Sequence, residues 1–157
     1  MDREELLRRY AAGERDFSGV DLSGVDVSGV DWDAEEQVGV DLTGINLSGA
    51  ILERTALCWS NLANANLRNT SLLDTSFVFS NLSGANLSGA NIEDADLDHA
   101  SLVNANLSKT RFYGVKVEGT DFTGANFTDA EGMTFMGYCI YCNTIMPDGS
   151  VRNSVEE

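Results

Sequence analysis

The cysteines and the single histidine are the residues whose side chains could carry out redox or metal chemistry. Cys139 and Cys142 have the C-x-x-C spacing that occurs in zinc sites and in redox pairs. No second cysteine pair accompanies them, and His99 is the only histidine, so the sequence favours neither a metal-ligating set nor a His-based catalytic dyad. We therefore expect a core thiol at Cys139, a surface thiol at Cys142, no role for Cys58, and no catalytic, cofactor-binding or metal-binding residue.

Carboxylates are the other chemically active groups, and they are in large excess. The chain has 25 Asp and Glu against 10 Lys and Arg, and residues 1–41 hold 12 of the acidic and 4 of the basic side chains. Such a charge repels nucleic acid and anionic membranes and attracts basic partners or cations. The candidate partner-binding surface comprises Asp21, Asp26, Asp31, Asp33, Glu35, Glu36 and Asp41. The alternative is a solvated acidic surface that only keeps the protein soluble.

A period of five residues organises the chain that must position these groups. Steps of five from Phe17 to Phe127 meet a large apolar residue at 22 of 23 positions, and Gln37 is the exception. Two positions earlier a small or β-branched residue recurs, with Glu35 as the exception. Two inward residues around one outward residue are typical of an extended segment, and the Ser, Gly, Asp and Asn that follow are turn formers. Each unit is therefore one short side and a corner, and successive units wind the chain into a coil.

The units resemble the A-(D/N)-L-x-x repeats of the pentapeptide-repeat family. Examples are ANLRN at 65–69, ANLSG at 85–89 and ADLDH at 95–99, and the resemblance extends from residue 16 to about residue 131. It implies an all-β solenoid, a right-handed four-sided β-helix with four units per coil and about 6–7 coils. With uniform coils of four units, Leu22 stacks on Leu42.

The ends of such a coil must be covered, because they expose apolar side chains. We expect residues 1–15 to form a helical cap, in which Asp2 and Glu5 have the spacing of a capping box. Residues 16–146 are expected to form the β-helix, and residues 147–157 a turn and a polar tail.

Two interruptions are expected within the coil. The segment near 33–39 contains Glu35, Glu36 and Gln37, two carboxylates and an amide that could not be buried unpaired, which predicts an outward loop. A phase shift near 131–133 is predicted because Met136, Tyr141 and Met146 resume the period one residue early.

The charge and the resemblance together favour a non-catalytic protein-interaction scaffold. We expect a protein partner, no direct nucleic-acid binding, no membrane association, no cofactor, and a monomer or weak dimer. The alternative is a DNA mimic that binds a topoisomerase such as gyrase, as some members of the resembled family do. An enzyme is disfavoured because no nucleophile–base pair or cofactor motif is present. The acidic residues after Met1 predict no secretory leader, and three cysteines fit a reducing compartment, so we expect a cytoplasmic protein.

Overall fold

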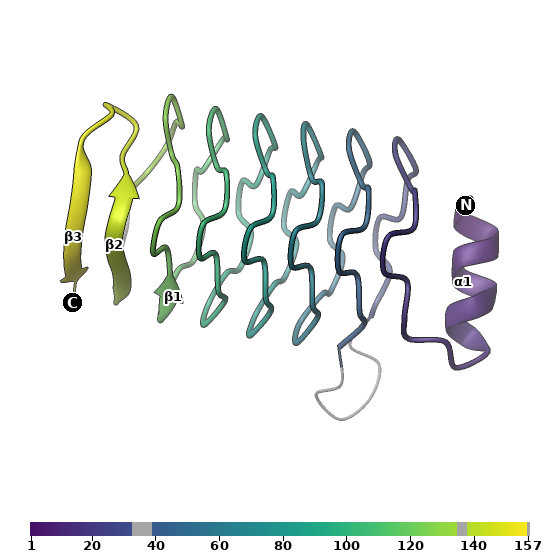
Figure 1. Ribbon diagram of the computed structural model, residues 1–157. Helices are drawn as coiled ribbons and strands as arrows, with labels where there is room; N and C mark the ends of the chain where they lie inside the picture. The colour runs from purple at the N-terminus through teal and green to yellow at the C-terminus, as the bar shows by residue number, and fades with distance from the viewer. Residues whose placement is uncertain (33–38, 135–137, 157) are drawn as a thin grey trace.

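The computed structural model describes residues 1–32, 39–134 and 138–156. A helix, α1 (Arg3–Ala11), precedes a series of stacked coils, and the chain ends with the strands β1 (Thr120–Asp121), β2 (Cys139–Ile145) and β3 (Val151–Glu156). Figure 1 shows a rod with α1 against one end and β2 and β3 at the other. No helix in the described part of the chain is long and apolar enough to cross a membrane.

Parallel backbone bridges hold each coil against the next, and through the middle of the chain each bridge joins a unit to the fourth unit after it. In one such coil the bridged residues are Asn61, Asn66, Ser71 and Ser76, which pair with Asn81, Asn86, Asn91 and Asp96. The apolar residue that follows adds a second bond, since the Leu62 N–H donates to the Asn81 carbonyl at 2.7 Å. Four bridges per coil define four walls, which we number first to fourth by Asn61, Asn66, Ser71 and Ser76.

The first coil is one unit longer than the coils that follow, and this changes which side chains stack. Asp16 bridges to Asp41, which lies five units later instead of four. Phe17 therefore lies in the column of Leu42, and the expected stacking of Leu22 on Leu42 is wrong. The error arises because a uniform coil of four units spans 20 residues, whereas the step from Asp16 to Asp41 spans 25.

The last coil is one residue shorter than its predecessors. Asp121 pairs with Ile140 and Asn126 with Ile145, and each of these steps falls one residue short of four full units. The shorter step is consistent with the positions of Tyr141 and Met146, which resume the period of five one residue early. The outward loop expected near 33–39 falls, except for its last residue, outside the described residues.

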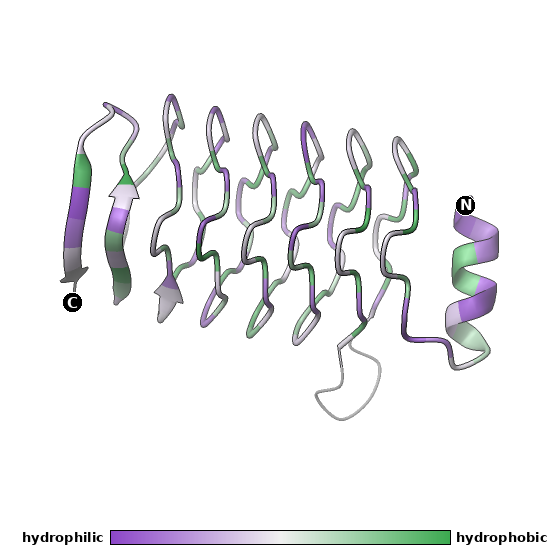
Figure 2. Cartoon of the chain, viewed as in Figure 1, coloured by the Kyte–Doolittle hydropathy of each residue, from purple (hydrophilic) through white to green (hydrophobic). Residues whose placement is uncertain are grey.

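The core is one continuous column of apolar side chains along the axis of the rod. Leu82 and Leu102 are fully buried, and so is Ala85 on the inward position two residues before a central apolar residue. Buried threonines satisfy their hydroxyls on the backbone: Thr75 Oγ1 donates to the Leu52 carbonyl at 2.7 Å. Figure 2 shows the resulting alternation of apolar and polar residues around every coil. Stacking of this kind makes the walls a rigid support for the side chains that point outward.

Helix α1 covers the first coil. The Asp2 carboxylate accepts the Glu5 N–H at 2.8 Å and caps the helix. Leu6 is fully buried against the coil, and the Tyr10 hydroxyl donates to the Trp32 carbonyl at 2.9 Å.

Strands β2 and β3 close the other end as an antiparallel pair. The turn between them is held by the Asp148 carboxylate, which accepts the Ser150 N–H at 2.9 Å. We expected a polar tail here, but Val151–Glu156 is a strand. Without β3, the outer edge of β2 would leave backbone N–H and C=O groups unpaired. β3 pairs with this edge and satisfies them.

Candidate functional site

The predicted acidic surface does not form one face of the rod. Consecutive units occupy consecutive walls, so residues five apart point in different directions. Asp21 lies on the second wall, Asp26 on the third and Asp31 on the fourth, while Asp41 lies on the first wall. We call these four residues the acidic belt, because they encircle the first two coils. The other members of the predicted surface lie outside the described part of the chain: Asp33, Glu35 and Glu36.

Asp21 and Asp26 of the acidic belt accept hydrogen bonds from the turn that follows each of them. The Asp26 carboxylate accepts the Ser28 hydroxyl at 2.6 Å and the Ser28 N–H at 2.9 Å, and Asp21 accepts the Ser23 N–H at 3.0 Å. These hydrogen bonds favour the charged form and lower the pKa of both carboxyls. The largest cause is the Ser28 hydroxyl for the pKa of Asp26 and the Ser23 N–H for the pKa of Asp21. These residues therefore stabilise turns in the backbone.

Acidic side chains gather on one face farther along the rod, on the fourth wall. Two adjoining coils contribute the outward residues Asp96, Asp98, Lys116 and Glu118, and Asp94 lies at the preceding corner. Four carboxylates and one ammonium group thus share a single face, which gives it a net negative charge.

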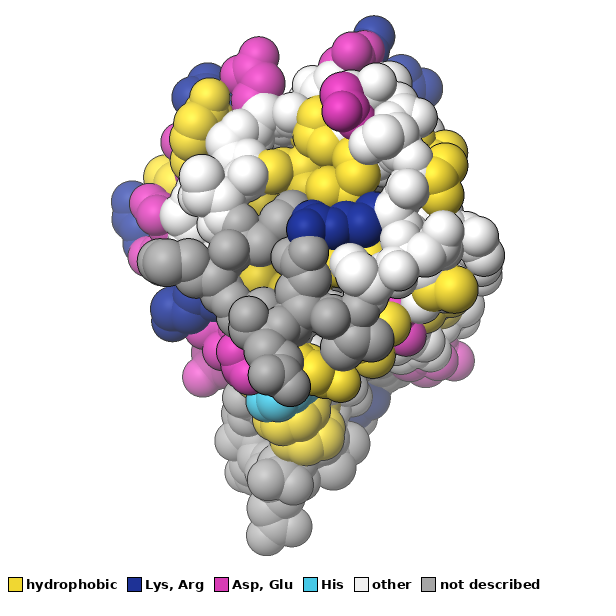
Figure 3. All heavy atoms as spheres, turned by 90° about the vertical axis from the view of Figure 1, so that its left-hand side faces the viewer, with side chains coloured by type: hydrophobic (Ala, Val, Ile, Leu, Met, Phe, Trp, Pro, Cys, Tyr) yellow, Lys and Arg dark blue, Asp and Glu magenta, His cyan; other side chains and the backbone are white. Residues whose placement is uncertain are grey.

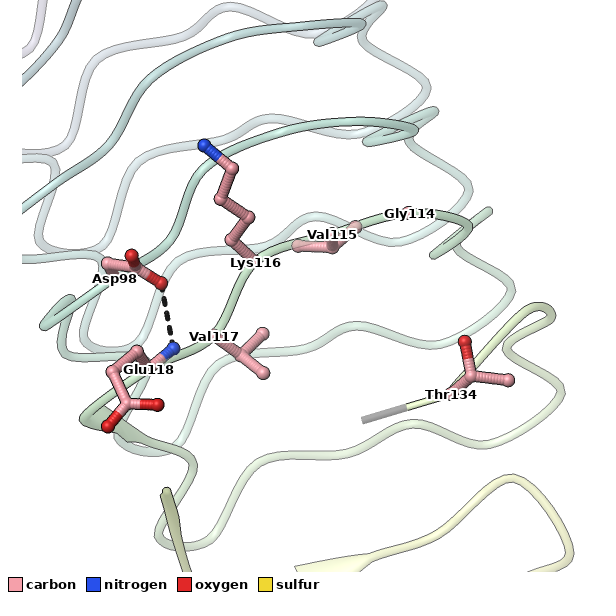
Figure 4. A pocket seen from close by; sticks show the side chains of 7 residues that line it. All are labelled: Asp98, Gly114, Val115, Lys116, Val117, Glu118 and Thr134. Atoms are coloured by element: carbon pink, nitrogen blue, oxygen red, sulfur yellow. Dashed lines mark hydrogen bonds between the residues drawn. The ribbon is translucent and has the colours of Figure 1, made fainter. Parts of the chain in front are cut away.

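Hydrogen bonds hold Asp96, Asp98 and Glu118 in place, and Figure 4 shows the one that joins Asp98 to Glu118. Asp98 Oδ1 accepts the Glu118 N–H at 2.7 Å, and Glu118 Oε2 accepts the Tyr138 N–H at 3.1 Å. Lys116 points the other way and pairs with Asp96 at 2.9 Å, which raises the pKa of the lysine. The second oxygen of Asp98 and of Glu118 has no hydrogen bond among the described residues. A hollow at the surface is lined by Asp98, Lys116 and Glu118, together with Gly114 and Thr134.

An aromatic stack follows the corner next to this wall. The rings of Trp59 and Phe79 are 4.3 Å apart and nearly parallel, and those of Phe79 and His99 are 4.8 Å apart at 14°. We call these three residues the aromatic corner. Trp59 is 38% exposed and Phe79 is 45% exposed, so both present large apolar surface to solvent.

The backbone at the aromatic corner is left-handed, with φ of 60° at Trp59, 58° at Phe79 and 59° at His99. This conformation is unfavourable for residues with a side chain other than Asn or Asp. The next residue in the column is Gly119, where a Cβ would overlap His99 Nδ1. Glycine at this position therefore lets the imidazole lie over the next coil, and the stack ends there.

Sequence reasoning missed the aromatic corner, although a signal was present. Trp59, Phe79 and His99 follow one another at intervals of four units, each at the turn position where most units carry Gly, Asn or Asp. A search for side chains in register by coil, instead of by unit, would have found them.

The thiols show no arrangement for chemistry. Cys139 is buried and Cys142 is exposed, which confirms the expected core and surface thiols, and none of the three cysteines is in a disulfide. Within the described ranges no group of three or more His, Cys, Asp or Glu side chains could hold a metal ion.

Comparison with known proteins agrees with the period and the coil. The model of the pentapeptide repeats family matches in eight copies over residues 50–89, 60–98 and 90–129. No protein of curated function matches at a significant level.

Three pentapeptide repeat proteins of known structure are similar to this chain. One from Nostoc PCC 7120 is 31% identical, over 85% of this chain and 88% of that chain, with a TM-score of 0.48. One from Cyanothece 51142 is 29% identical, over 74% and 97%, with a TM-score of 0.46. One from the thylakoid lumen of Arabidopsis thaliana is 32% identical, over 71% and 68%, with a TM-score of 0.45. The chain described here belongs to the pentapeptide-repeat family and folds as a four-sided β-helical solenoid.

Proposed function

We propose that this protein is a non-catalytic interaction scaffold that binds a basic segment of a partner protein on the fourth wall, across its carboxylates and the aromatic corner. One observation carries the proposal. Large aromatic side chains occupy exposed, left-handed corner positions directly beside a face with a net negative charge.

The energetics of the corner support a role other than folding. A left-handed backbone costs a residue with a side chain about 1–2 kcal/mol. Each stacked pair of rings returns only about 0.5–1.5 kcal/mol, and much of the ring surface of Trp59 and Phe79 stays in water. A partner that covers the two rings would remove this apolar area from water, and aromatic residues are enriched among the residues that dominate binding energy.

The scaffold holds this surface in one geometry before a partner arrives. The corner residues are fixed by backbone bonds to both neighbouring coils: Phe79 N–H donates to the Asp98 carbonyl, and Trp59 N–H donates to the Val78 carbonyl. Little conformational entropy remains to be lost on binding. The carboxylates of the wall attract a basic partner and accelerate its encounter. Three cysteines that form no disulfide fit a reducing compartment, and we place this function in the cytoplasm.

DNA mimicry, the second candidate, is less well supported by the distribution of charge. A mimic of duplex DNA presents negative charge along the whole rod. The second wall instead continues from Asp21 with uncharged amides at Asn46, Asn66, Asn86, Asn106 and Asn126. A gyrase supercoiling assay separates the candidates: inhibition by the wild type that is lost in Asp21→Asn/Asp26→Asn would favour mimicry over the scaffold.

Comparative capture tests the scaffold. Tagged wild type, Phe79→Asn, and Lys109→Asn as a matched control at a left-handed corner of the second wall are used to capture proteins from the same extract. We expect basic proteins that bind the wild type and the Lys109→Asn variant but not the Phe79→Asn variant. The same proteins in all three captures would refute the assignment of the surface.

A further inference from the structure

We propose that the partner segment is an amphipathic helix that lies along the rod, with apolar side chains over Val78 and Phe79 and basic side chains over Asp98 and Glu118. This inference rests on the proposed function, because it names the structure and the residue order of the segment that the fourth wall binds.

The fourth wall changes from apolar to acidic along the axis of the rod. In two adjoining coils its outward positions carry no charge, and they are Ala56, Cys58, Ser76 and Val78. The next two coils, toward β2, carry Asp96, Asp98, Lys116 and Glu118 at the same positions. Toward α1 the wall continues with Asp31. Figure 3, viewed from the C-terminal end, shows hydrophobic and acidic side chains beside the single histidine, which lies where the two parts meet.

The apolar part is accessible at the edges of its rings. Trp59 covers one face of the Phe79 ring and His99 covers the other, so a partner reaches the edge of this ring. The edge of an aromatic ring carries the positive part of its quadrupole and gives a cation no attraction. An aliphatic side chain can cover this edge and the half-buried Val78, because the hydrophobic effect has no direction. Apolar residues of the partner therefore belong over this part of the wall.

The acidic part offers two carboxylates to a basic side chain. Asp98 and Glu118 occupy equivalent positions in neighbouring coils, about 4.8 Å apart along the axis. Each accepts a backbone N–H with one oxygen, and the other oxygen has no hydrogen bond among the described residues. Lys116 forms its ion pair with Asp96, which leaves Asp98 and Glu118 to the partner. Both line the surface hollow, which a basic side chain can enter.

A helix suits this wall better than an extended segment does. Backbone groups of the wall bond to neighbouring coils: the Phe79 N–H donates to the Asp98 carbonyl at 3.0 Å, and the His99 N–H donates to the Glu118 carbonyl at 2.7 Å. An extended segment would leave its own backbone groups over the apolar rings without partners, whereas a helix satisfies its own N–H and C=O groups. One helical turn rises about 5.4 Å, close to the spacing of about 4.8 Å between coils, so successive turns of one helix face meet successive coils.

Fluorescence polarisation with two labelled helical peptides of equal composition tests the residue order. The first peptide has leucine in two successive turns of one face and lysine in the next two turns, and the second alternates leucine and lysine along that face. We expect the wild type to bind the first peptide about ten-fold more tightly, the gain of burying one apolar side chain on the corner. Phe79→Asn should remove this preference. Asp98→Asn/Glu118→Gln, which keeps both backbone hydrogen bonds, should weaken both peptides.

A matched control neutralises the same number of charges on other walls, with Asp129→Asn/Glu131→Gln, and should keep the preference. A proline at the centre of the first peptide should abolish its advantage, and an undiminished affinity would show that the segment does not bind as a helix. Equal affinity of the wild type for the two peptides, or a preference that survives Phe79→Asn, overturns the residue order. If Asp98→Asn/Glu118→Gln still weakens both peptides in that case, the proposed function stands without this inference. If that variant binds both peptides as the control does, the proposed function fails as well.

Discussion

Replacement of Phe79 by Asn should leave the stability of the solenoid almost unchanged, although a large aromatic side chain is removed. Phe79 has φ of 58° and is 45% exposed, and Asn tolerates the left-handed conformation. Relief of backbone strain is worth about 1–2 kcal/mol. The loss of two stacking contacts costs about 1–3 kcal/mol in total. The two effects oppose each other, so the free energy of unfolding should change by less than about 2 kcal/mol.

Phe77 provides an internal comparison two residues away. Its side chain is fully buried, and Phe77→Ala should lower the free energy of unfolding by about 3–5 kcal/mol. Urea denaturation followed by circular dichroism measures both variants against the wild type, with the midpoints compared at equal slope. A loss of stability in Phe79→Asn as large as that in Phe77→Ala would refute the reasoning, because the aromatic corner would then be part of the structural core.

Three further predictions concern the turn glycine, the acid response and the helical cap. Gly119→Ala should displace the His99 ring and cost about 1 kcal/mol of stability at a φ of 68°, as denaturation will show. Asp21 and Asp26 have a pKa lower in the folded protein than in the unfolded chain, so their stabilisation is complete above about pH 4 and is lost as the pH falls through the folded pKa. The thermal midpoint should therefore fall below about pH 4, and a midpoint constant to about pH 2 would contradict this. Asp2→Ala should destabilise the cap by about 0.5–2 kcal/mol, measured as a lower thermal midpoint, and no change would show that Asp2 does not cap.

The period of five was sufficient to predict the core, because burial and spacing are linked at every unit. Central residues such as Leu82 and inward small residues such as Ala85 are buried as the pattern requires. The stacking partner of Leu22 was not predictable, since the sequence does not say whether an off-pattern unit counts as a wall. The strand at Val151–Glu156 depends on the free edge of β2, a contact that no local pattern encodes.

The candidate site was predicted less well than the fold. Charge was counted along the chain, but a four-walled coil turns consecutive units to different sides. Asp21 and Asp26 are neighbouring repeats in sequence and lie on different walls, whereas Asp98 and Glu118 are a full coil apart in sequence and lie together. Function on a solenoid is encoded by coil register, and only the structure fixes that register.

The two tryptophans provide the most direct test of the binding surface. Trp59 lies at the exposed aromatic corner, and Trp32 is 2% exposed in the core. In an NMR titration with hexa-arginine, the indole N–H resonance of Trp59 and the backbone amides of residues 95–99 should shift, while the indole of Trp32 should not. An unshifted Trp59, with changes gathered instead at the acidic belt or spread over all four walls, would contradict the proposal that the fourth wall is the binding surface.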